Sequence, residues 1–313
     1  MRVEHPDALR SAVGAALGTA VVAAARVHGG DVAASYRMDL ADGRRVFAKT
    51  HPEAPAGFFT TEAAGLRWLR EPGVVAVPEV LAVSDGTGGA PNHLVLEWID
   101  EGRPGPGTEA DLGRALAALH QASAATFGRE DRRSTGSRGL PNEPCADWAT
   151  FYATQRLSPL ARLARDGGAL SAAALAGLER LDADRLREIG GPPEPPARLH
   201  GDLWAGNRLV GTDGRSWLID PACHGGHREF DLAMMRLFGG FGAECFAAYD
   251  AATPLADGWG DRVPLHQIAP LVVHAVKFGA ATRRPPPKRS PATPESTRTA
   301  SIRPAFCVVL PAP

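Results

Sequence analysis

Residues 200–207 of this 313-residue chain read HGDLWAGN, and a second aspartate, Asp220, follows after a short predicted hairpin. Asp202 stands five residues before Asn207, and Asp220 ends the next predicted strand. An Asp, an Asn and a later Asp in this order match the catalytic loop and the metal-binding position of phosphoryl-transferring enzymes. In that arrangement Asp202 meets the attacking hydroxyl as catalytic base, while Asn207 and Asp220 offer hard oxygen ligands to Mg²⁺. The alternative is that these residues only form a turn and end a strand.

A lysine and a glutamate far upstream fit the same chemistry. Segment 32–50 is predicted to form two strands joined by the turn Ala41-Asp42-Gly43, and Lys49 ends the second strand. Glu62 lies in the helix predicted over residues 60–71. A lysine held by a glutamate positions the α and β phosphates of ATP, so the pair supplies the second half of the apparatus.

The ends of that helix are also predicted from the sequence. Thr60 or Thr61 would supply the N-terminal cap, and Pro72-Gly73 would stop the helix. Two further strands are expected, one around residue 80 and one from Asn92 to Ile99.

The sequence gives weaker signals for two other parts of the nucleotide site, the hairpin that covers the phosphates and the contact with adenine. No G-x-G-x-x-G precedes Lys49, but a hairpin with exposed N–H groups after Gly29-Gly30 and the hydroxyl of Ser35 can cover phosphates. A plain turn explains the same residues. Adenine would lie against the strand that ends near Glu97 and Ile99, where backbone groups are available.

The order of the predicted elements indicates two lobes. Residues 1–100 read as a leading helix and a sheet, and the Gly- and Pro-rich residues 101–110 as the link between lobes. Residues 111–279 read as a mostly helical lobe that carries the catalytic loop. Residues 280–313 are rich in proline and arginine and lack an apolar pattern, which predicts a disordered tail. Within the second lobe the expected elements are helices over 111–124, in 146–166, in 171–190, near Asp231 and over 264–278, and a polar loop over 128–144.

Composition excludes several classes of function. The formal net charge of −1 gives no basic field for nucleic acid. The four cysteines are scattered without a C-x-x-C pair, which argues against a disulfide framework and fits the cytoplasm. No apolar stretch is long enough for a membrane span. The apolar run within residues 1–30 resembles a signal peptide, but charged residues precede it and its spacing suits an amphipathic helix.

Three other groups of residues have competing interpretations. Cys223, His224 and His227 raise the question of zinc, but no fourth ligand is evident, so we expect a tight turn beside the Mg²⁺ site. Asp231 is expected to be a structural acceptor that holds the catalytic loop. The tryptophans Trp204, Trp217 and Trp259 either line a sugar site or pack in the core.

Longer segments give a specific resemblance. HGDLWAGN, LIDPACHGGHREFDLAMMRLFGGFG, the FTTEAAGLRWLRE helix, Asp147-Trp148 and Arg156-Leu157 together resemble the fructosamine kinases, relatives of the aminoglycoside phosphotransferases. The resemblance covers roughly residues 1–279. It implies an α+β, bilobal, protein-kinase-like fold with a small antiparallel-sheet N-lobe, one main helix in that lobe, and a larger, mostly helical C-lobe.

The resemblance also implies an activity. The substrate would be a small-molecule or protein-bound ketosamine, phosphorylated by ATP and Mg²⁺ on its sugar 3-hydroxyl so that the adduct decomposes. Asp202 would be the base, Asn207 and Asp220 the Mg²⁺ ligands, and Lys49 with Glu62 the ATP contacts. Two features depart from the family: the last helix gives way to the tail 280–313, and the cysteine that eukaryotic members carry in the phosphate-covering loop has no counterpart.

Several alternatives stay open at this point. Ten residues separate Asp220 from Asp231 and no A-P-E follows, so a peptide-docking activation segment is missing and a small substrate is favoured. A kinase for an aminoglycoside or a choline-like metabolite uses the same nucleotide machinery. A non-catalytic pseudokinase is disfavoured because the residues of the apparatus are retained: Lys49, Asp202, Asn207 and Asp220. The sequence leaves the oligomeric state open.

Overall fold

The structure is a computed structural model. It describes residues 6–27, 33–86, 89–129, 131, 134–135 and 139–279. The predicted tail over 280–313 and the glycines of the phosphate-covering hairpin lie outside the described residues.

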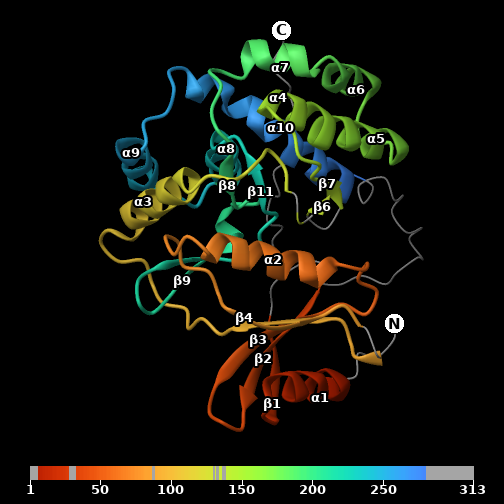
Figure 1. Cartoon of the computed structure of the whole chain (residues 1–313), viewed down its shortest axis with the longest axis vertical. Helices are drawn as coiled ribbons and strands as arrows, with labels where there is room; N and C mark the ends of the chain where they lie inside the picture. The colour runs from red at the N-terminus through yellow and green to blue at the C-terminus, as the bar shows by residue number, and fades with distance from the viewer. Residues whose placement is uncertain are drawn as a thin grey trace, which may run out of the picture.

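The N-terminal lobe is built on a five-stranded antiparallel sheet in the order β1-β2-β3-β5-β4 (Figure 1). Its strands are β1 (Val21–Val27), β2 (Ala34–Leu40), β3 (Arg45–Thr50), β4 (Val80–Ser84) and β5 (His93–Glu97). The turn predicted between β2 and β3 is confirmed: Gly43 has φ +87°, and the Asp42 carboxylate accepts the Arg44 N–H at 3.0 Å.

The sequence suggested that the apolar run at the N-terminus forms one helix. In the structure it forms a helix and a strand. Helix α1 (Pro6–Leu17) ends before Gly18, which has φ +68°, and the remaining apolar residues form β1. Strand β1 gains hydrogen-bonded partners along β2, which a longer helix would forgo. Tertiary pairing therefore overrides the local helical pattern in the second half of the run.

Helix α2 (Phe58–Arg70) is the main helix of this lobe and carries Glu62. The predicted N-cap, Thr60 or Thr61, is wrong: the N-cap is Gly57 at φ +82°, and the Thr60 hydroxyl donates instead to Asp85 at 2.7 Å. Leu66 and its neighbour on the same face, Leu69, are fully buried, as the spacing predicted. The helix ends before Pro72.

The C-terminal lobe is mostly helical. Its helices are α3 (Thr108–Gln121), α4 (Trp148–Phe151), the π-helix Tyr152–Leu157, α5 (Ser158–Asp166), α6 (Ala172–Glu179), α7 (Ala183–Ile189), the 3₁₀ turn Ala205–Asn207, α8 (Glu229–Phe238), α9 (Ala243–Ala252) and α10 (Trp259–Phe278). Its strand pairs are β6 (Ser134–Thr135) with β7 (Leu140–Pro141), β8 (Ala197–Leu199) with β11 (His224–Gly226), and β9 (Arg208–Val210) with β10 (Ser216–Leu218).

Three of these elements differ from the expected ones. Helix α3 begins at Thr108, inside the segment assigned to the link between lobes. The helix expected over 171–190 is divided in two, because Asp182 caps α7 through its carboxylate. Helix α9 was not predicted.

Helix α2 connects the two lobes. In Figure 1 it lies between the N-terminal sheet and the C-terminal helices. Its apolar face shares one buried core with residues of α3, α8 and α9. Arg198 of β8 adds a polar connection, because its guanidinium donates to the Trp68 carbonyl at 2.5 Å and stacks 4.6 Å from the Trp68 ring centre. Glu62 is thus carried on a helix that both lobes hold.

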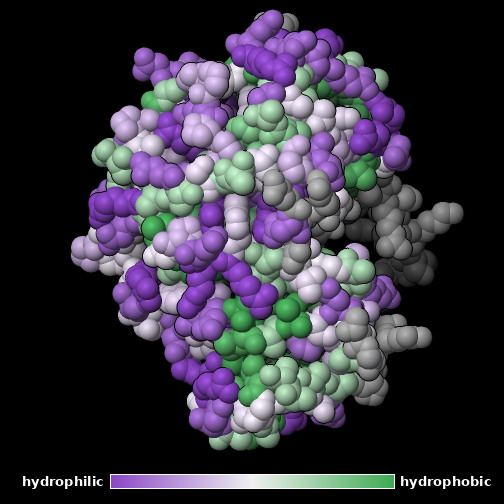
Figure 2. Space-filling model, in the orientation of Figure 1, coloured by the Kyte–Doolittle hydropathy of each residue, from purple (hydrophilic) through white to green (hydrophobic). Residues whose placement is uncertain are grey.

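Hydrophilic and hydrophobic side chains are unevenly distributed over the face shown in Figure 2. The face in Figure 2 is mainly hydrophilic over the C-terminal lobe, with hydrophobic side chains gathered over the N-terminal sheet. Within the described ranges, no helix is both long and apolar enough to cross a bilayer. The architecture is α+β, with a small antiparallel-sheet lobe and a larger, mostly helical one, as expected.

Candidate active site

Lys49 forms the centre of an ion-pair triad at the base of the N-terminal sheet. Its ammonium donates to Glu62 of α2 at 2.8 Å and also contacts the Asp220 carboxylate, 171 residues away in the chain. Lys49 is 8% exposed. Three charged groups from the sheet, from α2 and from the segment after β10 therefore converge, as the sequence predicted for Lys49 and Glu62.

A second cluster holds the residues of the catalytic loop. The Asn207 amide nitrogen donates to the Asp202 carbonyl at 2.8 Å, to the Asp202 carboxylate at 3.2 Å and to the Asp220 carbonyl at 3.4 Å. Asn207 therefore links the two aspartates. Within the described part of the chain the side-chain amide of Asn207 forms its hydrogen bonds through the nitrogen, so the side-chain oxygen is available to a hard cation.

Those oxygen donors fit Mg²⁺. The Asn207 amide oxygen and the Asp220 carboxylate are the hard ligands that this ion prefers. Asp220 has φ +53°, a conformation that a non-glycine residue adopts at some cost and that often marks functional sites.

The catalytic loop is anchored from below by Asp231 of α8. Its carboxylate accepts the backbone N–H of His200 at 2.7 Å and of Gly201 at 2.9 Å. His120 of α3 lies 3.4 Å from the same carboxylate and contacts the Tyr249 hydroxyl at 2.8 Å. The expectation that Asp231 acts as a structural acceptor agrees with this geometry, whereas nothing in the sequence pointed to His120 or Tyr249.

The loop also depends on glycine. Gly201 has φ +80°, and a Cβ atom there would lie 2.2 Å from the Ala222 carbonyl oxygen. Only glycine allows this close approach between the catalytic loop and the segment after Asp220.

Burial and charge shift the pKa values of the carboxylates in different directions. Burial raises the pKa of Asp202 to about 6, although the Asn207 hydrogen bond opposes the shift. Burial also raises the pKa of Glu62, helped by the nearby Asp220 charge. Burial alone would raise the pKa of Asp220 too, but Lys49 outweighs it and lowers that pKa. The same carboxylates outweigh the burial of Lys49 and raise its pKa.

Of the residues expected around the nucleotide, Ser35 lies beside Lys49 in the sheet, and Glu97 and Ile99 lie at and beyond the end of β5. Ser35 of β2 pairs directly with Lys49 of β3, so the two side chains share one face of the sheet, and Ser35 is buried. Glu97 ends β5, but its N–H already donates to the Glu79 carbonyl at 2.9 Å. An adenine contact at Glu97 would therefore need another group. Ile99 follows the strand in irregular chain.

Cys223, His224 and His227, for which zinc was the disfavoured interpretation, do not form one cluster of ligands. His224 lies in β11, where a tight turn was expected, and the Cys223 thiol contacts the Gly65 carbonyl at 3.4 Å. The one group in the described residues with metal-ligand spacing is His227, Glu229 and His266, whose ligand atoms lie within 4.8 Å of one another. It contains neither Cys223 nor His224.

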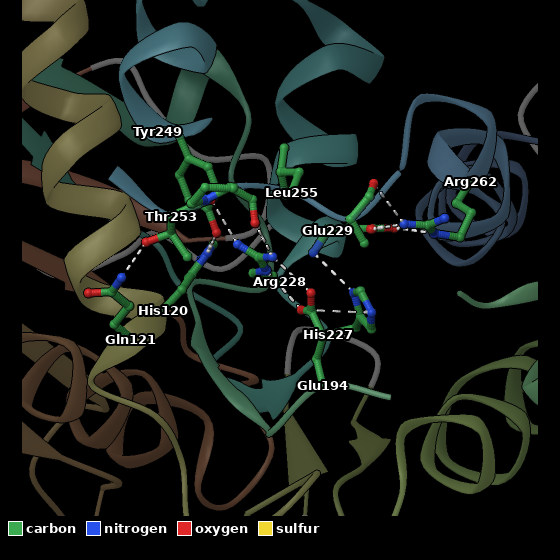
Figure 3. A network of polar contacts seen from close by, with 12 residues as sticks. His120, Gln121, Glu194, His227, Arg228, Glu229, Tyr249, Thr253, Leu255 and Arg262 are labelled. Carbon is green, nitrogen blue, oxygen red and sulfur yellow. Dashed lines mark hydrogen bonds and ion pairs between the residues drawn. The ribbon is translucent and has the colours of Figure 1, made fainter. Parts of the chain in front are cut away.

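That group belongs to a structural ion-pair network (Figure 3). Arg262 of α10 holds both oxygens of Glu229, at 2.5 and 3.0 Å, and a cation would have to displace this guanidinium. Beside it, Arg228 holds both oxygens of Glu194 at 2.8 Å, and the His227 ring lies 4.0 Å from the same carboxylate. The network joins α8 to α10 and to the chain before β8.

Comparison with known proteins agrees with this geometry. The family model for fructosamine kinase matches residues 7–285. The chain belongs to the fructosamine kinase family. A probable ketoamine kinase from Lactiplantibacillus plantarum is 38% identical over 253 residues, which cover 81% of this chain and 88% of that protein.

Solved structures give the same result. A putative fructosamine-3-kinase from Thermobifida fusca has 42% sequence identity and a TM-score of 0.79, and the match covers 88% of this chain and 94% of that one. Aminoglycoside phosphotransferase APH(4)-Ia, at 16% identity and a TM-score of 0.58, shares the fold over 88% of this chain and 95% of its own. The fold is thus the protein-kinase-like one. The protein is a kinase that uses ATP to phosphorylate a hydroxyl group.

Proposed function

We propose that this kinase phosphorylates the 3-hydroxyl of the sugar in ketosamines, small or protein-bound, so that the adduct decomposes and the amine is released. The observation that carries the proposal is the meeting of two clusters, Lys49 with Glu62 and Asp202 with Asn207, through Asp220, in a chain of the fructosamine kinase family. The activity would be a cytoplasmic one.

Each cluster has its own role in the proposed reaction. Lys49, fixed by Glu62, binds the α and β phosphates of ATP as a positioned cation. Asn207 and Asp220 hold Mg²⁺, which neutralises phosphate charge. Residues 1–100 form the nucleotide-binding lobe, 101–110 the link and 111–279 the lobe that binds the acceptor. Ser35, Glu97 and Ile99 line the nucleotide.

Asp202 is the catalytic base in this proposal. It accepts the proton of the sugar hydroxyl as that oxygen attacks the terminal phosphorus of ATP, and ADP leaves. Asn207 keeps the Asp202 carboxylate oriented through the contact at 3.2 Å. Asp231 holds the backbone on the other side of the loop, so the base is positioned before the substrate binds.

The acceptor is a small hydroxyl compound because the chain leaves little room for peptide docking. Only residues 221–228 separate Asp220 from α8, and three of them pair with β8. An activation segment of the protein-kinase type has no place there. No observation on the site favours an aminoglycoside or a choline-like acceptor over a ketosamine.

A panel of acceptors tests this function. We expect fructosyl- and ribulosyl-amines to be phosphorylated, and the free amines and aminoglycosides to be inert. A compound without the ketosamine sugar would leave unpaired the buried polar groups that recognise the sugar hydroxyls, and this is costly. NMR of the product should locate phosphate on the third carbon of the sugar. Phosphate on aminoglycosides alone, or ATP turnover that no ketosamine stimulates, would reject the assignment.

A further inference from the structure

Aromatic side chains gather beside the catalytic base, outside the residues that handle the nucleotide. Trp204, Phe238 and Phe278 are 40%, 47% and 42% exposed, and they make up half of the six exposed large hydrophobic side chains of the described residues. The others, such as Leu163 of α5, lie on separate elements. Exposed aromatic rings grouped at one place commonly mark a binding surface.

The rings are contiguous. The ring centres of Trp204 and Phe238 are 6.1 Å apart, those of Phe238 and His274 6.2 Å, and those of His274 and Phe278 4.5 Å. We call these four residues the aromatic strip. It runs from the catalytic loop over the end of α8 to the last turns of α10, three segments that are distant in sequence.

One end of the strip is fixed to the catalytic loop. Trp204 donates its backbone N–H to the Asp202 carbonyl at 3.1 Å. Its indole lies over Gly206, because a Cβ atom on Gly206 would come within 2.2 Å of the ring. An acceptor with its hydroxyl at Asp202 therefore has the strip as a neighbouring surface.

A positive charge accompanies the other end. The Lys277 ammonium lies 5.1 Å from the Phe278 ring centre. A second cation placed on this end of the strip would lie close to the Lys277 ammonium, and like charges repel.

We propose that the aromatic strip is the subsite for the amine-derived part of the ketosamine, and that it prefers an aromatic or apolar part without positive charge. This inference rests on the proposed function, since it places the sugar at Asp202 and the remainder of the substrate on Trp204, Phe238, His274 and Phe278. Stacking between rings gives a modest, graded preference, so many amines react but not equally.

The test uses the full chain and three fructosyl-amines that differ in the amine part: benzylamine, ethanolamine and the cationic 1,3-diaminopropane. We expect kcat/KM for the benzyl compound to exceed that for the hydroxyethyl compound about 3- to 10-fold, the range for one aromatic contact. The compound with the cationic tail should react more slowly than the hydroxyethyl one. Phe238→Ala and Phe278→Ala should each lower the ratio of kcat/KM for the benzyl compound to kcat/KM for the hydroxyethyl compound toward one.

Leu163→Ala is the matched control, because it removes an exposed apolar side chain from α5, and it should leave the ratio as in the unmodified protein. A ratio that both phenylalanine variants retain, or that the control lowers equally, would overturn the subsite. A chain that ends at Gly279 gives a further check. If the benzyl preference appears only after this truncation, the tail occupies the strip in the full chain and the proposal is wrong.

Failure of the proposed function is distinguishable from failure of the subsite. If no ketosamine is phosphorylated, the proposed function falls, and calorimetric binding of the benzyl and hydroxyethyl compounds in the presence of ADP and Mg²⁺ decides on the strip. Tighter binding of the benzyl compound that Phe238→Ala abolishes supports it. Equal affinities overturn it.

Discussion

Asp202 and Asp220 have different neighbours at the scale of single residues, although both contact Asn207. The Asp220 carboxylate contacts Lys49, whereas the Asp202 carboxylate contacts only the Asn207 amide in the described residues. Asp220 meets Asn207 through its backbone carbonyl. We therefore predict that the two carboxylates have separable functions.

We expect Asp202→Asn to lower kcat by about 10²- to 10⁴-fold, the range for the loss of a positioned base, while nucleotide still binds. Asp220→Asn should instead weaken Mg²⁺-dependent ATP binding, since it removes a charged ligand. Steady-state kinetics and calorimetric titration of ATP with and without Mg²⁺ separate the two effects. Near-normal turnover in Asp202→Asn would remove Asp202 from the role of base.

Glu229 links stability to pH. Burial alone would raise the pKa of Glu229, but the approach of His266 at 3.3 Å and the two contacts from Arg262 outweigh it and lower the pKa to about 2. The ordinary pKa of a glutamate in an unfolded chain is about 4.3. Because the folded-state pKa is the lower one, the contribution to stability is complete above the unfolded value and is lost as pH falls toward 2.

We therefore expect the free energy of unfolding to fall more steeply between about pH 5 and 2 in the unmodified protein than in Glu229→Gln, which cannot titrate there. Urea unfolding at a series of pH values measures both slopes. Asp184→Asn, an exposed carboxylate paired with Arg187 at 2.7 Å, is the comparison at the surface. Equal slopes in the unmodified protein and in Glu229→Gln would show that Glu229 does not contribute.

At the scale of elements, the position of α2 determines whether Glu62 reaches Lys49. The distance between α2 and the segment after Asp220 depends on the contact that Gly65 makes with that segment. A Cβ atom on Gly65 would lie 3.2 Å from the Cys223 sulfur and 3.4 Å from a Pro221 ring carbon. A methyl group at this position would therefore need its neighbours to shift by a few tenths of an ångström, and a larger side chain would need a larger displacement.

We expect Gly65→Val to displace α2 and to lower kcat/KM for ATP by about 10-fold or more, because small displacements of a positioning group are costly. Ala64→Val is the control: it adds the same side chain to the same helix at the neighbouring, partly exposed position. Kinetics with ATP as the varied substrate, together with the melting temperature, measure the effect. An identical loss in both variants would mean that the contact of Gly65 with Cys223 and Pro221 is not responsible.

At the scale of the whole molecule, residues 6–279 contain every side chain assigned to the site, from Ser35 to Phe278. We expect removal of residues 280–313 to leave kcat per folded molecule unchanged, because that proline- and arginine-rich segment contributes no catalytic group. Active-site titration with steady-state kinetics tests this. Protection of its amides from hydrogen exchange, or inactivity of a well-folded truncated protein, would contradict the prediction.

The sequence by itself determined the α+β, two-lobe class of the fold and the turn at Asp42-Gly43, because turn chemistry is local. It also places Asp202 and Asn207 five residues apart on one loop, and from this spacing it predicts their roles in catalysis and Mg²⁺ binding. The predicted N-cap of α2 is wrong because a contact distant in sequence intervenes: Thr60 has the right chemistry for a cap, but its hydroxyl donates to Asp85 instead.

Only the tertiary structure decided which distant groups meet. The contact of Lys49 with Asp220 spans 171 residues, the pairing of β1 with β2 converts a helical pattern into a strand, and Tyr249 supports Asp231 through His120. The aromatic strip likewise joins three segments that no spacing relates. Such contacts depend on packing and strand pairing between segments that are distant in the chain, so a local pattern of residues does not predict them.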